Sequence, residues 1–141
     1  MTDAPTAPER VPLVLAPGEG RSYPMGRLSA VFKADGTETD GSCSIAEWWL
    51  DPHTKGHDAH SHPPDDLFFV LEGTMSFLVG EEWVDAAPGT FLLVPGGVTH
   101  AFENRTDTRA GTLNISAPDL EGRMPAFADW FRQRPPDDAA C

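Results

Sequence analysis

The side chains with the clearest chemical potential lie between residues 60 and 66. His60 and His62 are two residues apart, and Asp66 follows four residues after His62. In an extended strand alternate side chains point to the same face, so the two imidazoles project together. Asp66 has the same parity and joins them if the two prolines in between keep the register. Imidazole and carboxylate groups bind borderline transition metals, so this stretch predicts most of a metal site.

Four other titratable residues could take part in such a site. His100 lies in a later predicted strand. His53 and His57 lie in a loop rich in turn residues and are interpreted as surface histidines. For His57 the alternative is a proton shuttle at the mouth of a pocket. Asp65 is an alternative carboxylate ligand, but its parity points it away from the two neighbouring histidines.

Short strands separated by Gly and Pro turns must position these side chains. Strands are expected at residues 11–15, 28–33, 44–50, 67–71, 74–79, 83–84, 90–94, 98–103 and 112–116, with a turn at 34–41. The first strand would lie at a sheet edge, where Pro12 is tolerated. With hardly a helix between the strands, the pattern indicates an all-β sandwich or barrel.

One helix is expected near the C-terminus. The apolar side chains at helical spacing are Met124, Phe127, Trp130 and Phe131. They predict a short amphipathic helix over residues 121–132. It would pack on the barrel or across a dimer contact, with a lid over the site as the alternative.

Length and charge limit the class of protein. The 141 residues leave room for one domain, expected over residues 11–132, between disordered tails at 1–10 and 133–141. The chain carries 22 acidic and 10 Lys/Arg residues, a net charge of −12, which opposes binding to nucleic acid or an anionic membrane. No apolar run reaches the length of a membrane span, and residues 1–10 do not resemble a signal peptide.

The two cysteines, Cys43 and Cys141, are too few for a disulfide framework. We interpret both as free thiols in a reducing cytoplasm, where the protein is expected to be located. A nucleophilic role for Cys43 lacks support, because the residues on either side of it supply no base.

Two motifs resemble those of the cupin superfamily. The pattern H-x-H-x3-D-x6-G, which resembles the first cupin motif, is formed by His60, His62, Asp66 and Gly73. The pattern G-x5-P-x-G-x2-H-x3-N, which fits the second, is formed by Gly89, Pro95, Gly97, His100 and Asn104. The short stretch between them is similar to that of small single-domain bacterial cupins, and the resemblance covers about residues 42–118. The glycines and Pro95 are expected to make turns, and Asn104 to tie down a turn.

Two positions depart from the cupin pattern. Thr54 stands where a Gly opens the first motif, although Gly56 is nearby and can supply the loop conformation. Asp66 stands where cupins usually have Glu. Because Asp is one methylene shorter, three arrangements stay open. Asp66 binds the ion at a strained distance, binds it through a water, or does not bind it and acts as a base beside three histidines.

The resemblance implies a jelly-roll β-barrel, also described as a double-stranded β-helix. It implies one divalent transition metal ion per chain, held by His60, His62, Asp66 and His100. Fe, Ni, Mn, Co and Zn all suit these ligands, so the ligand types do not identify the ion. It also implies a homodimer, with the N-terminal strand or an outward-facing Trp at the contact.

Strand parity also predicts the side chains around the site. The expected pocket residues are Trp48, Phe68, Val70 and Phe102, with Trp49 pointing the opposite way from Trp48. They are either ordinary core or a dry aromatic pocket that suits a flat or apolar substrate. Glu47 is either an additional acid/base group or an exposed charge.

A shared fold does not choose among reactions, so three hypotheses stand. The first is a metal-dependent dioxygenase similar to the small quercetinase-like cupins, in which Asp66 or Glu47 takes a proton from a small organic substrate. The second is a non-redox epimerase, isomerase or cyclase of secondary metabolism, with Zn or Ni as Lewis acid. The third is a metal-containing protein that binds a small molecule without turnover.

Overall fold

The computed structural model describes residues 10–56 and 58–118. The expected C-terminal helix, both expected tails apart from residue 10, Cys141 and His57 lie outside the described residues. The strands are β1 (Arg21–Met25), β2 (Leu28–Ala34), β3 (Ser44–Leu50), β4 (Thr54–Lys55), β5 (Asp65–Glu72), β6 (Met75–Val79), β7 (Glu82–Ala86), β8 (Phe91–Val94), β9 (His100–Asn104) and β10 (Ala110–Ala117). A helical turn, α1 (Gly36–Thr39), joins β2 to β3.

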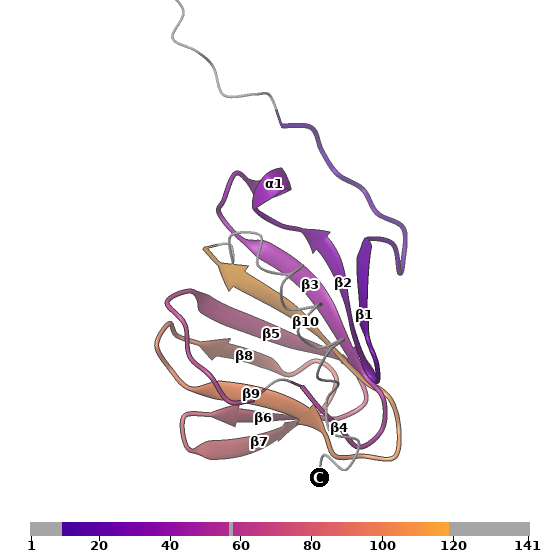
Figure 1. Cartoon of the computed structure of the whole chain (residues 1–141), viewed down its shortest axis with the longest axis vertical. Coiled ribbons are helices and arrows are strands. Elements are labelled where there is room, and N and C mark those ends of the chain that lie inside the picture. The colour runs from indigo at the N-terminus through magenta and orange to yellow at the C-terminus, as the bar shows by residue number, and fades with distance from the viewer. Residues whose placement is uncertain (1–9, 57, 119–141) are drawn as a thin grey trace, which may run out of the picture.

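The strands form two antiparallel sheets that close around one core (Figure 1). The larger sheet has the order β1-β2-β3-β10-β5-β8, and the smaller has the order β4-β9-β6-β7. Strands far apart in the sequence are neighbours, because β10 lies between β3 and β5. This topology confirms the predicted all-β jelly-roll barrel.

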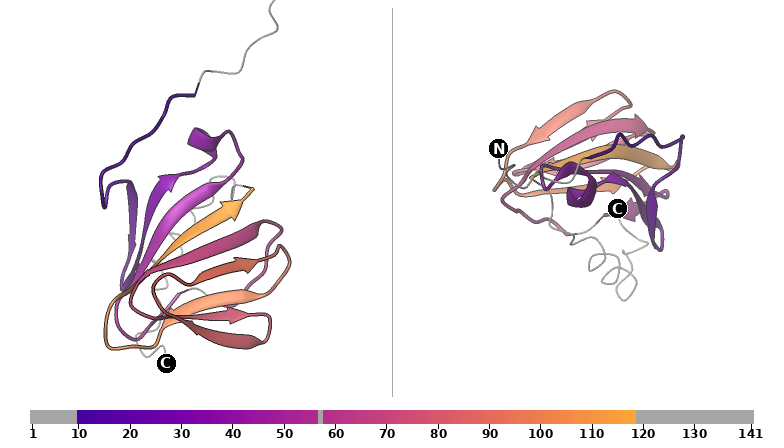
Figure 2. Two further views of the ribbon diagram at one scale, coloured as in Figure 1. Left: turned by 180° about the vertical axis from the view of Figure 1, so that it is seen from behind. Right: turned by 90° about the horizontal axis from the view of Figure 1, so that it is seen from above.

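The prediction of a strand at residues 11–15 was wrong. These residues pair with no described strand, and their apolar side chains Val11 and Val14 are 81% and 90% exposed. The edge position belongs instead to β1, which pairs with β2 and contains Pro24. Figure 2 shows the segment before β1 extending beyond the sheets. A strand needs a partner, and sequence alone did not reveal which segment has one.

The predicted turn at 34–41 contains α1, which begins with a capping box. The Asp35 side chain accepts a hydrogen bond from Thr37 N, and the Glu38 side chain accepts one from Asp35 N. This reciprocal pattern, Asp followed three residues later by Glu, is a helix-start signal that the Gly and Thr content of the segment obscured. Arg21 of β1 forms ion pairs with Asp35 and Glu38, which fasten the helix to the sheet edge.

The core joins the inner faces of the two sheets through aromatic contacts. Trp48 of β3 meets Phe102 of β9 edge-on, with 5.9 Å between ring centroids. Phe68 of β5 lies 4.9 Å from Phe77 of β6. The predicted inward direction of Trp48, Phe68, Val70 and Phe102 is confirmed, because all four are buried. Trp49 points to the outer face, as its parity predicts, and the Arg109 guanidinium lies 3.9 Å from its ring centroid.

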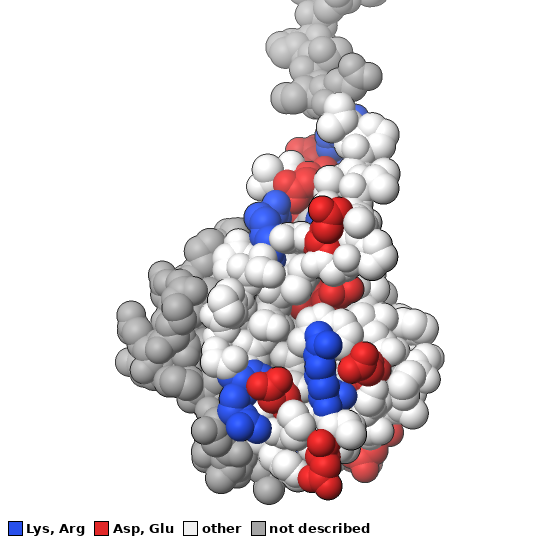
Figure 3. All heavy atoms as spheres, turned by 90° about the vertical axis from the view of Figure 1, so that its right-hand side faces the viewer, with Lys and Arg blue, Asp and Glu red and all other residues white. Residues whose placement is uncertain are grey.

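Acidic and basic side chains are interspersed on the face of the molecule that Figure 3 presents. Within the described part of the chain, no helix has the length and apolar character needed to cross a membrane.

Asn104 ties two loops together at one end of the barrel, as predicted. Its side-chain NH2 donates to Leu50 O, Asp51 O and Thr108 O at 2.7–3.2 Å. Its side-chain oxygen accepts from the backbone N and hydroxyl of Thr106. The side chain is fully buried, so these groups depend on one another for their hydrogen bonds.

We expect Asn104→Ala to lower the free energy of unfolding by at least about 2 kcal/mol, because it leaves several buried polar groups unpaired. Urea unfolding monitored by tryptophan fluorescence measures the change. Asp107→Asn, at an exposed position of the same turn, is the matched control and should stay within about 0.5 kcal/mol of the natural chain. Equal stability of the Asn104 variant and the natural chain would contradict this account.

Candidate metal centre

The two histidine motifs are joined directly through their backbones. His60 N donates to His100 O at 3.1 Å, and His100 N donates to His60 O at 2.8 Å. Two residues further on, His62 O accepts a hydrogen bond of 2.9 Å from Gly97 N. The segment before β5 therefore runs antiparallel to the start of β9, which brings its side chains beside His100.

The turn before β9 requires glycine where it passes this segment. A Cβ atom at Gly96 would lie 2.0 Å from Pro63 O, so a larger residue would push the two motifs apart. Gly96 N donates to Asp65 Oδ1 at 2.7 Å. Asp65 therefore holds the turn and is exposed, whereas Asp66 is buried, as their opposite parity predicts.

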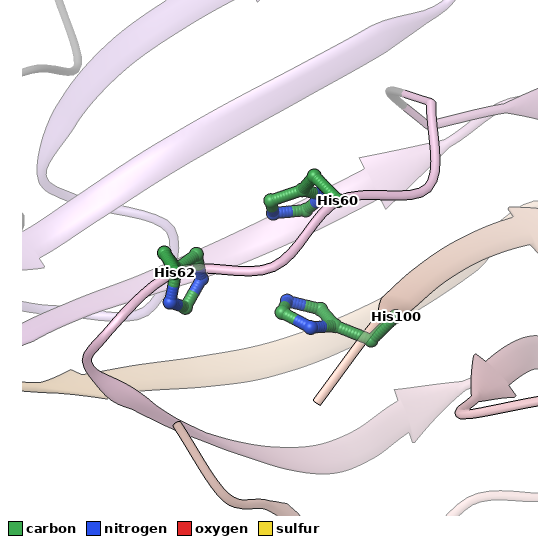
Figure 4. A group of neighbouring side chains, drawn as sticks. All are labelled: His60, His62 and His100. Atoms are coloured by element: carbon green, nitrogen blue, oxygen red, sulfur yellow. The ribbon is translucent and has the colours of Figure 1, made fainter. Parts of the chain in front are cut away.

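The rings of His60, His62 and His100 face one another (Figure 4). Their centroids are 4.4 Å apart for His60 and His100, 4.9 Å for His62 and His100, and 5.3 Å for His60 and His62. One ring nitrogen from each lies within 4.8 Å of the others. His100 is buried and the other two are half-buried. The three imidazoles form a group that can hold a metal ion.

Each imidazole is oriented by a backbone carbonyl two residues away in the chain. The Nδ1 atoms of His60, His62 and His100 lie 3.1, 3.0 and 2.9 Å from the carbonyl oxygens of Asp58, Pro64 and Val98. A carbonyl oxygen only accepts, so Nδ1 carries the proton in all three rings. The Nε2 atom is left to bind an ion, as in metal sites whose outer hydrogen bonds fix the histidine tautomer.

Asp66 lies against two of these histidines. Its Oδ2 atom is 2.8 Å from His62 Nε2 and 2.9 Å from His100 Nε2. Its Oδ1 atom accepts hydrogen bonds from Ser116 Oγ at 2.5 Å and Asn114 Nδ2 at 3.2 Å. The carboxylate is buried, with both oxygens in polar contacts.

These contacts shift the pKa values of the buried pair. Burial opposes ionisation of Asp66, but polar neighbours outweigh it and hold the pKa of this carboxyl below its ordinary value. In order of effect, these neighbours are His100, Ser116, His62 and Asn114. Burial likewise favours neutral His100, but the hydrogen bonds to Asp66 and Val98 and the charge of Asp66 raise the pKa of His100. Both shifts favour the charged forms, the carboxylate of Asp66 and the imidazolium of His100.

The donor set fits a divalent transition ion. Binding would displace the Nε2 proton of His100, since a metal ligand must be a neutral imidazole. The Nδ1 hydrogen bonds would persist, because the bound nitrogen is the other one. The three imidazoles suit several first-row metals, so the fit leaves the identity of the metal open.

The remaining predicted residues lie outside this cluster. Glu47 alternates with buried residues of β3 and faces outward, where it approaches Lys33 at 3.6 Å and accepts a hydrogen bond from Trp49 Nε1 at 3.1 Å. The structure therefore does not bring Glu47 to the histidines. His53 is exposed and pairs with Asp107, as expected of a surface histidine. Cys43 is a half-buried free thiol.

Among the predicted pocket residues, Phe68 lies beside the cluster. Its ring centroid is 6.4 Å from that of His100, and the two rings meet edge-on. The rings of Trp48 and Phe102 meet edge-on in the core, and Val70 is fully buried. The described contacts of these three are those of packing residues.

Sequence reasoning missed the two residues that hold Asp66. Asn114 and Ser116 lie on β10, and Ser116 is the register partner of Asp66. The available signal was parity, because Thr112, Asn114 and Ser116 alternate with apolar residues and share one face of the strand. Polar side chains on an inward face indicate a buried polar partner, which the pattern does not identify.

Comparison with known proteins places this geometry in a family. The sequence pattern of the "Cupin domain" family matches residues 46–116, just over half of the chain. Uncharacterized protein SCO3923 of Streptomyces coelicolor is 31% identical over 58 residues, which are 41% of this chain and 55% of that protein. The chain thus spans about half the length of the curated relative that it matches.

Solved structures share the fold. An RmlC-like cupin from Shewanella frigidimarina superposes with a TM-score of 0.67 at 17% identity, covering 79% of this chain and 96% of that chain. A sugar phosphate isomerase of the cupin superfamily from Silicibacter pomeroyi gives 0.58 at 25% identity, covering 70% and 68%. With a jelly roll that brings two histidine motifs to one point, and with the domain pattern over half its length, this chain belongs to the cupin family.

Proposed function

We propose that this protein is a metal-dependent enzyme that acts on a small organic substrate. The observation that carries the proposal is the meeting of three imidazoles and one carboxylate, all oriented by hydrogen bonds, at the inner face of the barrel. A purely structural role would not require the Nε2 atoms of three histidines to face one another. A cytoplasmic location stays our expectation.

In this proposal Asp66 is the fourth ligand. Two ligands about 2.1 Å from an ion and at right angles to each other are about 3.0 Å apart. The distances from Asp66 Oδ2 to His62 Nε2 and His100 Nε2, 2.8 and 2.9 Å, match such adjacent positions. This supports direct binding of an ion by Asp66 over binding through a water.

Different residues of the chain would have different roles at the site. When bound, a divalent ion supplies a positive charge that polarises a substrate oxygen or, if redox-active, brings dioxygen and substrate together. The carbonyls of Asp58, Pro64 and Val98 keep the imidazoles in one orientation, so little reorganisation accompanies the reaction. Phe68 lies beneath His100 and excludes water from that side.

For the reaction we propose dioxygenation of a flat, enolisable substrate that binds through a hydroxyl or enolate oxygen. The aromatic ring of Phe68 beside His100 supports a flat substrate, and the ligand set suits iron, nickel, manganese or cobalt. Asp66 is the carboxylate beside the histidines that would accept a substrate proton.

A non-redox isomerisation is the second candidate. The observation that favours it is the similarity, at 25% identity, to a structure described as a sugar phosphate isomerase. The same ligands would then hold an ion, such as zinc, that acts only as a Lewis acid.

The first prediction concerns metal binding. We expect His60→Ala and His100→Ala to weaken binding of a divalent ion at least about 100-fold, because loss of a ligand costs more than loss of its outer hydrogen-bond partner. Titration against a competing chromophoric chelator measures the affinity, and elemental analysis measures the bound metal. His53→Ala removes an exposed histidine and should bind as the natural chain does. Unchanged affinity in both ligand variants would exclude this site.

The second prediction concerns the reaction. With an active substrate, we expect one dioxygen consumed per product, measured with an oxygen electrode, and loss of this consumption in His100→Ala. Turnover at an equal rate without oxygen would eliminate dioxygenation in favour of isomerisation. A metal-loaded protein that binds such compounds without converting them would support the non-catalytic alternative.

We also propose that the chain forms a homodimer through the outer face of the larger sheet. Phe69, Phe91 and Leu93 are 43%, 59% and 54% exposed, and Phe69 is the register partner of Phe91. Leu67, Leu113 and Ile115 extend the same face. An apolar face is complementary to a copy of itself, and a chain of net charge −12 associates most readily through an uncharged patch.

The third prediction follows from this contact. We expect Phe91→Glu to convert the dimer to a monomer, because it buries two like charges across the two-fold axis. Light scattering after size exclusion measures the mass. Val84→Glu places the same charge on an exposed position of β7 and should leave the dimer intact. A natural chain that is monomeric at micromolar concentration would refute the assembly.

A further inference from the structure

The carboxylate of Asp66 presents its two oxygens to different surroundings. Oδ2 faces the Nε2 atoms of His62 and His100, whereas Oδ1 faces β10 and lies within hydrogen-bond distance of two side chains of that strand. The torsion that interchanges these oxygens is soft in a free aspartate. The two oxygens are chemically equivalent, so the contacts to one of them matter because they fix the plane of the carboxylate and thereby the position of the other oxygen beside the histidines.

Ser116 makes the shorter of these contacts. Its hydroxyl donates to Asp66 Oδ1 at 2.5 Å, a distance typical of a hydroxyl bonded to an ionised carboxylate. Ser116 is 1% exposed and is the backbone register partner of Asp66. Its hydroxyl has no access to water, and its position is fixed by the sheet.

Asn114 makes the second contact and is itself held. Its Nδ2 atom donates to Asp66 Oδ1 and also to Leu67 O, both at 3.2 Å. The bond to the backbone of β5 orients the amide, so that its other hydrogen points at the carboxylate. Two donors on one strand thus converge on a single oxygen.

We propose that Ser116 and Asn114 are positioning residues, which pin Asp66 Oδ1 so that Oδ2 is presented to the metal ion. The inference rests on the proposed function, since it assigns the carboxylate to an ion. It also accounts for the use of Asp in place of the longer Glu. Aspartate has fewer rotatable bonds, and two donors opposite it fix the carboxylate where its reach is just sufficient.

The test measures Co²⁺ binding to the full chain. Ser116→Ala and Asn114→Ala should each weaken Co²⁺ binding by about 10- to 100-fold, measured against a competing chelator. They should also change the visible absorption of bound Co²⁺, which reports the geometry of its ligands. Ser116→Thr keeps a hydroxyl at the same position and should restore both the affinity and the spectrum.

A matched control separates positioning from packing. Ser76 is a buried serine of the other sheet, and its hydroxyl donates to Asp85 Oδ1 at 2.7 Å. Ser76→Ala removes the same kind of hydrogen bond away from the histidines. It should leave the affinity and the Co²⁺ spectrum unchanged, whatever it does to thermal stability.

The outcomes are distinguishable. If the natural chain binds Co²⁺ and folded Ser116→Ala and Asn114→Ala bind it with the same affinity and spectrum, the positioning role is overturned and the metal site stands. If the natural chain binds no Co²⁺ and contains no other metal, the proposed function and this inference both fall. Should Ser116→Ala not fold, Asn114→Ala against Ser76→Ala decides between these outcomes.

Discussion

The site depends on the pair of backbone hydrogen bonds that His60 and His100 exchange. The two residues belong to motifs separated by four strands, and neither motif alone contains three imidazoles. Because the paired segments run antiparallel, the side chains of opposed residues emerge on the same face at short distance. The close passage of Gly96 past Pro63 serves this pairing, since any Cβ at that glycine would separate the segments. The jelly roll can therefore be understood as the framework that makes this one pairing possible.

A second constraint is electrostatic. Removing a carboxylate from water costs several kcal/mol unless charges and donors compensate. Around Asp66 the compensation is divided between the histidines on one side and β10 on the other. The consequence is that the carboxylate stays ionised while buried, as the lowered pKa of Asp66 reflects. An ionised group held in place is also what a cation needs, so the same contacts serve the stability of the metal-free chain and the proposed site.

Strand parity and motif spacing sufficed to predict the fold class, the inward direction of Phe68 and Phe102, and the opposite roles of Asp65 and Asp66. Both properties are local, since side-chain direction alternates along any strand. The features that could not be predicted depend on which strands pair with each other. Residues 11–15 are apolar enough for a strand but pair with none of the described strands. Of the two alternatives for Glu47, the structure supports the exposed charge, because its face of β3 is the outer one. The role of Ser116 and Asn114 could not be predicted, because their polar partner lies on β5, which pairs with β10 across a long sequence separation.

The arrangement of the three imidazoles is compatible with more than one reaction. Carbonyls of the chain set the direction of each imidazole, and these bonds would be the same whether the ion were zinc or iron. The choice between redox and Lewis-acid chemistry must therefore come from the ion acquired and from the side chains that meet a substrate. Of the residues predicted to form a pocket, Phe68 has a described ring contact with His100, and Trp48 and Phe102 contact each other across the two sheets. In the proposed enzyme, Phe68 is therefore a described side chain whose packing against His100 can influence the ligand group.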